Sequence, residues 1–312
     1  MRIRAILSIL CVTALAAGIV SAAPPAQIRV EVNLVNLFAT VRDKHKAVIT
    51  GLTKDDFQVY EDGQLQEITN FSADSNLPIT LGILLDTSGS EYYMLSGIKE
   101  AASRFLGRVM RKGDEAMVMT FDTDVDLLAD FTADRARLDR AINRAQINVP
   151  GGGSIIAQGP LPSSGGGGTN FYDAVYLAAH DKLSGEAGRK AIVVLSDCED
   201  TGSKVRLQEA IETAQRTDTV VHILLVSADG GDQDTARKIT NETGGRTIIV
   251  RSERNLEQAF DEISEELRNQ YTLGYTPTNK ARDGAYRKVR IDMKNKDYSA
   301  LTRRGYYAPA PQ

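Results

Sequence analysis

The chain has 312 residues, of which 42% are hydrophobic and 25% are charged, and its formal net charge is −4 at pH 7. This composition is typical of a soluble globular protein, not of a disordered or membrane-embedded chain. The mildly acidic balance gives no broad electrostatic attraction for nucleic acid or anionic lipid. We therefore expect a folded protein without a nucleic-acid partner.

Residues 1–22 have the features of a secretory signal peptide. Arg2 and Arg4 precede an almost unbroken apolar run from Ala5 to Val20, and small residues follow. We expect cleavage after Ala22, which leaves no segment apolar enough to cross a membrane. The alternative is a retained anchor, for which the apolar run is short compared with a span of about 20 residues. We expect an exported protein located in the periplasm, at the cell surface or in the medium.

Two regions with β patterns flank the centre of the chain. Residues 23–76 alternate in short apolar runs that are separated by turn signals such as Glu61-Asp62-Gly63. Residues 269–307 return to this pattern in Tyr271–Tyr275 and Tyr286–Met293. We hypothesise that these two β segments pack together into one module. Residues 308–312 are expected to form a disordered tail.

The central region, residues 77–268, alternates between strand and helix patterns. Strand-length apolar runs lie at Ile79–Leu85, Ala116–Phe121, Ala191–Leu195, Val220–Val226 and Thr247–Val250. Helical patterns lie at Ile98–Met110, Asp134–Arg144, Tyr172–Leu183, Val205–Gln215 and Asn255–Leu267. Nearly continuous Val, Ile and Leu strands between amphipathic helices indicate a sheet that is covered on both faces. The predicted fold class is α/β, a doubly wound and mostly parallel sheet flanked by small β segments.

Polar side chains follow the predicted strands in three loops. The first loop offers Asp86, Ser88 and Ser90, the second offers Thr169 after a Gly-rich run, and the third offers Asp197. Ligands of open α/β sheets bind outside the carboxyl ends of the strands, so we expect these residues to converge. All five offer oxygen atoms, which hard cations prefer. The sequence therefore predicts a divalent-cation site, with Mg²⁺ expected first and Mn²⁺ or Ca²⁺ as alternatives.

This pattern resembles the metal-ion-dependent adhesion site (MIDAS) of von Willebrand factor A (VWA) domains. Asp-x-Ser-x-Ser at Asp86 is similar to the first motif of that family, and Thr169 and Asp197 fall where the family supplies its threonine and its second aspartate. The flanking segments, Leu52–Phe57 and Gln270–Tyr275 among them, resemble a bacterial family of exported "VWFA-related" proteins. This resemblance covers almost the whole mature chain.

The resemblance implies how the site works. The three hydroxyls would bind the cation directly, whereas Asp86 and Asp197 would act largely through water. One coordination position would then stay open for an Asp or Glu of a protein partner. The predicted function is an exported, metal-dependent protein-binding or adhesion module.

One residue departs from the family pattern. Many relatives carry Gly directly after the second aspartate, whereas this chain carries Cys198. If the position requires a positive φ, Cys imposes strain there. A thiol beside a hard-metal site could also bind softer ions or become oxidised. We expect a tolerated substitution and an ordinary oxygen site.

Other acidic residues have simpler interpretations. Asp122, Asp124 and Asp126 begin like a calcium-binding loop, but Leu and Ala replace the Gly and Glu that such a loop needs at its sixth and twelfth positions. We expect a turn between two strands there. Asp173 and Glu199 could support the metal ligands, or could act as helix-capping or solvated side chains.

Catalysis finds little support in the sequence. The three histidines, His45, His180 and His222, are not placed to act as a general base, and the Gly-rich run lacks the Lys of a phosphate-binding loop. We therefore do not expect an enzyme. The alternative functions are a structural protein of the cell envelope with a silent metal site and, least favoured, a metal-dependent hydrolase.

Overall fold

A computed structural model of the chain describes residues 34–73, 77–147, 168–227 and 230–311. The predicted signal peptide, residues 1–22, lies outside the described residues. None of the helices within these ranges is both long and apolar enough to span a membrane.

The central region folds into a six-stranded sheet in the order β10-β9-β8-β5-β6-β7. Its strands are β5 (Ile79–Asp86), β6 (Glu115–Phe121), β7 (Val125–Thr132), β8 (Arg189–Ser196), β9 (Thr219–Val226) and β10 (Thr247–Val250). All neighbouring strands pair in parallel except β6 and β7, which pair antiparallel at one edge. The predicted α/β fold with a mostly parallel sheet is confirmed.

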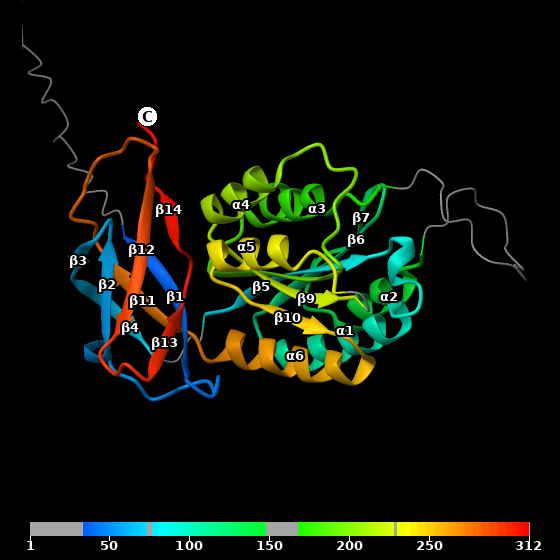
Figure 1. Cartoon of the computed structure of the whole chain (residues 1–312), viewed down its shortest axis with the longest axis horizontal. Helices are drawn as coiled ribbons and strands as arrows, with labels where there is room; N and C mark the ends of the chain where they lie inside the picture. Colours follow the sequence, from blue (N-terminus) through cyan, green and yellow to red (C-terminus); the bar gives the residue numbers. More distant parts are fainter. Residues whose placement is uncertain (1–33, 74–76, 148–167, 228–229, 312) are drawn as a thin grey trace, which may run out of the picture. The chain divides into compact units, whose positions relative to one another are not determined.

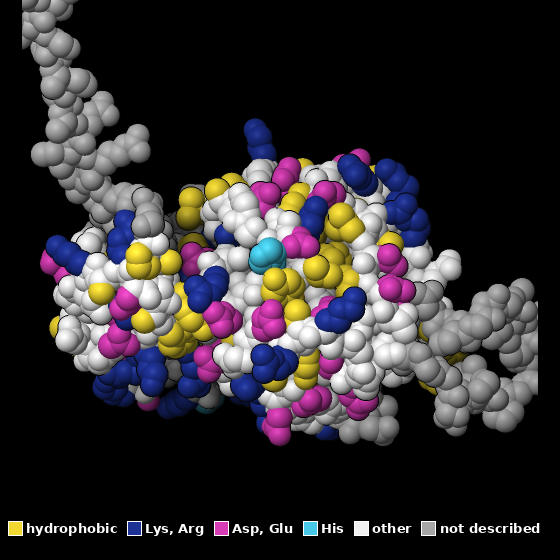
Figure 2. Space-filling model, turned by 90° about the horizontal axis from the view of Figure 1, so that it is seen from above, with side chains coloured by type: hydrophobic (Ala, Val, Ile, Leu, Met, Phe, Trp, Pro, Cys, Tyr) yellow, Lys and Arg dark blue, Asp and Glu magenta, His cyan; other side chains and the backbone are white. Residues whose placement is uncertain are grey.

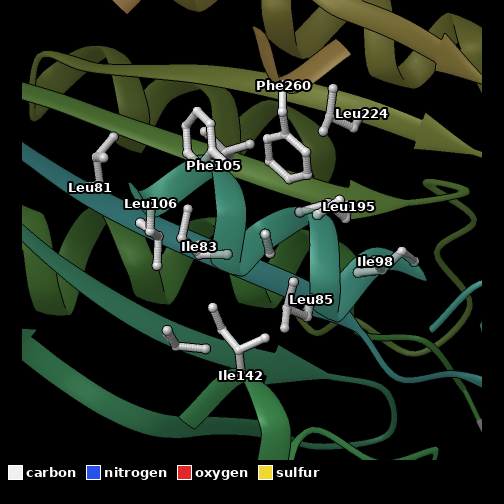
Figure 3. Packing of buried hydrophobic residues seen from close by; sticks show 14 of the residues in the cluster. Leu81, Ile83, Leu85, Ile98, Phe105, Leu106, Ile142, Leu195, Leu224 and Phe260 are labelled. Atoms are coloured by element: carbon white, nitrogen blue, oxygen red, sulfur yellow. The ribbon is translucent and has the colours of Figure 1, made fainter. Parts of the chain in front are cut away.

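Helices cover both faces of this sheet (Figure 1). One face carries α1 (Leu95–Val109), α2 (Arg135–Arg144) and α6 (Glu253–Arg268), and the other carries α3 (Phe171–Leu177), a π-helical turn η3 (Ala178–Leu183), α4 (Leu207–Arg216) and α5 (Gln233–Thr243). Side chains of β5 alternate between the two layers, because successive residues of a strand point to opposite faces. Ile83 packs with Phe105 and Phe260, whose rings lie 4.7 Å apart (Figure 3), whereas Leu84 packs with Phe171.

The β-patterned segments form two four-stranded sheets, in the orders β13-β1-β11-β4 and β14-β12-β2-β3. Their strands are β1 (Val35–Asp43), β2 (Phe57–Glu61), β3 (Gln64–Gln66), β4 (Ile68–Ser72), β11 (Tyr271–Tyr275), β12 (Tyr286–Met293), β13 (Tyr298–Leu301) and β14 (Gly305–Tyr307), with a short 3-10 turn, η1 (Lys54–Asp56), before β2. Strands from both ends of the chain pair, since β1 joins β11 and β2 joins β12. We call these two sheets the β module.

One hydrophobic core joins the two sheets of the β module. Leu37 and Leu273 from the first sheet pack with Val59 and Ile291 from the second. The carboxylate of Glu61 is buried in this module and accepts hydrogen bonds from two tyrosine hydroxyls. The N-terminal and C-terminal β segments therefore form one packed unit.

The end of the chain is ordered further than we expected. Ala308 is buried and its N–H donates to the carbonyl of Ala285, and the carbonyl of Pro309 accepts from Gly284. The first two residues of the expected disordered tail are thus held by backbone hydrogen bonds.

On the face that Figure 2 shows, acidic and basic side chains are interspersed, as is typical of a surface that contacts water.

Candidate metal centre

The candidate site lies where the strand order of the six-stranded sheet reverses. From β5 the chain adds β6 and β7 on one side, and later β8, β9 and β10 on the other. Such a reversal leaves a crevice at the carboxyl ends of the two central strands, which is the usual ligand position of open α/β sheets. Asp86 is the last residue of β5, and Asp197 directly follows β8. The hydroxyl of Ser196 donates to Asp86 Oδ2 over 2.6 Å, which links the two strand ends.

The loop after β5 brings two hydroxyls to this edge. The backbone N–H of Ser88 donates to Asp86 Oδ1 at 2.9 Å, which folds the loop back over the strand end. The hydroxyl oxygens of Ser88 and Ser90 lie 3.0 Å apart. Asp86 is fully buried, whereas Ser90 is exposed. The loop therefore presents one buried carboxylate and two hydroxyls.

Thr169 reaches the same edge through the loop that follows β8. Its N–H donates to the Thr201 hydroxyl at 2.9 Å, and its carbonyl accepts from the backbone of Thr201 and Gly202. A larger residue at position 202 would collide with the side-chain oxygen of Asn170, so Asn170 would have to shift to admit it. The contacts of Thr169 thus tie it to the segment after Asp197, and not directly to Asp86.

A residue that the sequence analysis missed, Glu91, joins the two aspartates. Carboxylate oxygens of Asp86, Glu91 and Asp197 all lie within 4.8 Å of one another, and all three side chains are buried. Glu91 ends a short 3-10 turn, η2 (Gly89–Glu91), directly after the predicted ligand Ser90. The site therefore holds three carboxylates where we expected two.

The electrostatics of this group call for a positive charge. Burial raises the pKa of Asp86 to about 6, although hydrogen bonds from Ser196 and Ser88 oppose the rise. Burial, together with the negative charges of Asp86 and Asp197, raises the pKa of Glu91 to about 9. Like charges that share a dry site disfavour ionisation of one another. A hard divalent cation with oxygen ligands would remove this conflict, so the donor set fits such an ion.

Cys198, which stands where many relatives carry Gly, has a φ of 62°. The position therefore has the positive φ that favours glycine. Its side chain is fully buried in the apolar cluster beneath α3 and α4. Burial, with the nearby charge of Asp197, raises the pKa of the thiol well above its usual range, so the thiol stays protonated. The thiol packs into the apolar core, and the three residues of the metal group, Asp86, Glu91 and Asp197, all offer carboxylate oxygens.

Two of the remaining acidic candidates, Asp173 and Asp122, have structural roles. Asp173 accepts backbone N–H groups of Lys204 and Val205 and so fixes the segment between β8 and α4. Glu199 is exposed. Asp122 lies in the turn between β6 and β7, which confirms the predicted turn, and its carboxylate accepts from the Thr87 hydroxyl at 2.8 Å.

An open groove lies away from this group of carboxylates. It has a volume of about 930 Å³ and lies between β12 and the C-terminal end of α5. Its lining includes Arg290, which pairs with Asp292 and stacks over the ring of Tyr60. The groove brings together no group of buried carboxylates such as the one at the strand ends, which therefore remains the better candidate for chemistry.

Comparison with known proteins agrees with this fold. Residues 81–199 match the family model for the von Willebrand factor type A domain. The structure is similar to a von Willebrand factor type A protein from Catenulispora acidiphila, with a TM-score of 0.51 and 13% identity over 89% of this chain and 74% of that chain. It is also similar to proximal thread matrix protein 1 from the mussel byssus, solved with a zinc-occupied MIDAS motif, with a TM-score of 0.50 and 16% identity over 66% of this chain and 49% of that chain.

No curated protein is significantly similar to this chain. The identities to the solved structures are low, so these likenesses concern the fold and not the ligand. The matched segment, residues 81–199, runs from β5 through β8 and therefore includes both strand ends of the candidate site. This part of the chain, residues 81–199, is thus the part that matches the von Willebrand factor type A domain.

Proposed function

We propose that this protein is an exported, metal-dependent protein-binding module. Asp86, Ser88, Ser90, Thr169 and Asp197 would hold a divalent cation, Mg²⁺ in the first place, and the cation would coordinate an acidic residue of a protein partner. The observation that carries this proposal is the meeting of the Asp86 and Asp197 carboxylates at the strand-order reversal, where the hydroxyl of Ser196, next to Asp197, donates to Asp86.

The chemistry of the donors supports a cation of this class. The site offers carboxylates and hydroxyls, which suit Mg²⁺, Mn²⁺ and Ca²⁺. The mussel byssus protein with zinc in its MIDAS motif supports a divalent ion at the equivalent place on this fold. A carboxylate from a partner is a suitable additional ligand for such an ion, so metal affinity and partner affinity would be coupled.

Binding, not catalysis, is the activity that we propose. His222 lies inside β9, fully buried, with its Nδ1 atom 3.6 Å from Glu266. His45 and His180 are exposed. A hydrolase of the serine type would need a histidine within reach of its nucleophile, and these positions do not favour one.

Thermal unfolding with and without metal tests the proposal. At about 100 times its dissociation constant a cation adds about 2.7 kcal/mol, which shifts the midpoint of a domain of this size by about 5–10 °C. We expect this shift with Mg²⁺ relative to EDTA, and its loss in Asp197→Ala. Glu199→Ala, which removes an exposed neighbouring carboxylate, should keep the shift.

The second candidate is a structural envelope protein whose metal site is silent. The β module favours it, because two sheets with a core of their own offer contact surfaces that need no cation. Equal unfolding midpoints in EDTA and in millimolar Mg²⁺, Mn²⁺ and Ca²⁺ would favour this candidate over metal-dependent binding.

Export is a separate part of the proposal and rests on residues 1–22. Fusing these residues to a reporter enzyme that folds only outside the cytoplasm should give an active reporter. An inactive fusion, beside an active fusion with a known signal peptide, would contradict export.

A further inference from the structure

We propose that Glu91 is an internal ligand of the cation, and that it fills the coordination position which a partner's carboxylate would otherwise take. This inference rests on the proposed function and adds a form of regulation to it. The site would be closed by its own chain, and a partner would have to displace Glu91.

The burial of Glu91 within an otherwise exposed turn is the first line of evidence. Gly89, Ser90, Tyr92 and Tyr93 are exposed, with Tyr92 at 56% and Tyr93 at 83% of their full accessibility. Glu91 alone is buried, at 2%. A surface turn is normally anchored by an apolar side chain, since burying an unpaired charge is costly. An acidic anchor indicates that the site supplies an attractive partner for a carboxylate.

The position of the Glu91 carboxylate is the second line of evidence. Its oxygen lies within 4.8 Å of those of Asp86 and Asp197, a spacing at which one ion can contact all three. The backbone N–H of Asp197 donates a hydrogen bond to the Glu91 carboxyl. The N–H of Glu91 in turn donates to the carbonyl of Ser88 at 3.1 Å. Glu91 is therefore held between the two loops that supply the other ligands.

Charge balance gives this position a consequence for binding. Two aspartates neutralise a divalent cation, and Glu91 makes the loaded site negative by one charge. A partner's carboxylate added to that site would meet repulsion, because like charges in a poorly solvated site interact strongly. Exchange of Glu91 for the partner's carboxylate would instead leave the net charge unchanged. Displacement is therefore the favoured route.

The turn has room to make this exchange. The side of Gly89 where a Cβ atom would be attached faces open space, with no packed neighbour within 4 Å of that point. Tyr92 and Tyr93 contact each other edge to face, with ring centroids 5.3 Å apart. Because the turn is anchored through Glu91, release of Glu91 would move the two exposed rings with it.

Manganese binding to the purified protein tests this inference. Mn²⁺ affinity is measured by electron paramagnetic resonance, and the number of water molecules on the bound ion by water proton relaxation. Glu91→Gln and Glu91→Ala should weaken Mn²⁺ binding about tenfold or more, and should add about one exchangeable water to the bound ion. Acetate, used as a free carboxylate, should displace that water in Glu91→Ala but have no effect on the wild type.

A matched control separates a ligand from a nearby charge. Glu199→Gln removes one exposed carboxylate next to Asp197 and should change neither the affinity nor the water count. Equal or tighter Mn²⁺ binding by Glu91→Gln, with an unchanged water count, would overturn the inference and leave the proposed function in place. Failure of the wild type to bind Mn²⁺ would overturn both.

Discussion

Replacing Glu91 by Gln should stabilise the protein when divalent cations are removed with EDTA, and the gain should grow with pH. Burial and the charges of Asp86 and Asp197 raise the pKa of the Glu91 carboxyl from 4.5 to about 9. The unfolded chain therefore releases this proton at a lower pH than the folded protein does. The stability that belongs to the protonated carboxyl is fully present below pH 4.5, and it is lost as the pH rises toward 9.

The size of the effect follows from the two pKa values. Between them, folding takes up one proton at Glu91, so each pH unit costs about 1.4 kcal/mol of unfolding free energy. The cost is therefore below about 1 kcal/mol at pH 5 and about 3 kcal/mol at pH 7. Gln has nearly the shape of the protonated acid and takes up no proton, so the variant avoids this cost.

Urea unfolding in EDTA at several pH values, followed by circular dichroism, measures this gain. The difference in unfolding free energy between Glu91→Gln and wild type should rise by about 2.5 kcal/mol from pH 5 to pH 7. Glu199→Gln should show no such rise, because Glu199 is exposed. If Glu91→Gln is no more stable than wild type at pH 7 in EDTA, the reasoning about the three carboxylates is wrong.

Three further predictions concern other parts of the molecule. Cys198→Gly should be more stable than Cys198→Ala by about 1 kcal/mol in urea unfolding, because the position has a positive φ that favours glycine. His222→Gln should lose less stability than wild type when the pH falls below 6.5. Burial lowers the pKa of His222 despite the nearby Glu266, so the imidazole of the unfolded chain takes up a proton at a higher pH than that of the folded protein. Equal losses of unfolding free energy in urea titrations would contradict this. Tyr275→Phe should lower the unfolding free energy by about 2 kcal/mol, because the buried carboxylate of Glu61 loses one of its two tyrosine donors.

Much of the fold was predictable because its strands are strongly patterned. Runs such as Ile79–Leu85 have no polar face, and only a central parallel strand with helices on both sides buries such a run. This placed Asp86 at a strand end, and the same argument placed Asp197. The meeting of the two residues depends on β5 and β8 being neighbours, which follows from the strand order and not from local sequence.

Helix α5 was harder to predict from the sequence. Between Gln233 and Thr243 only Ala236 and Ile239 are apolar, which is too few for a clear amphipathic stripe. The structure completes the buried face with threonines, among them Thr240, whose hydroxyl bonds to the carbonyl of Ala236. Threonine satisfies its own polar group inside a helix in this way, and the pattern of apolar residues does not show it.

Glu91 carried a signal that the sequence analysis did not use. It lies four residues before Leu95 and seven before Ile98, two buried residues of the face by which α1 packs onto the sheet, although Glu91 itself belongs to the turn before that helix. Residues at these spacings share one side of a helix. An acidic residue that extends a buried stripe by one turn, directly after a metal-binding motif, indicates a carboxylate that points into the site.

Cys198, which departs from the family pattern, and Glu91 act on the same aspartate. Cys198 fills the core beneath Asp197 with an apolar side chain, and Glu91 adds a negative charge beside it. An apolar wall reduces screening and therefore strengthens both the repulsion among the carboxylates and their attraction to a cation. The free-energy cost of the metal-free site is therefore higher than it would be with water in the place of the Cys198 side chain. We therefore expect occupancy of the site and the position of the Gly89–Glu91 turn to be coupled, since a divalent cation is what makes the inward position of Glu91 favourable.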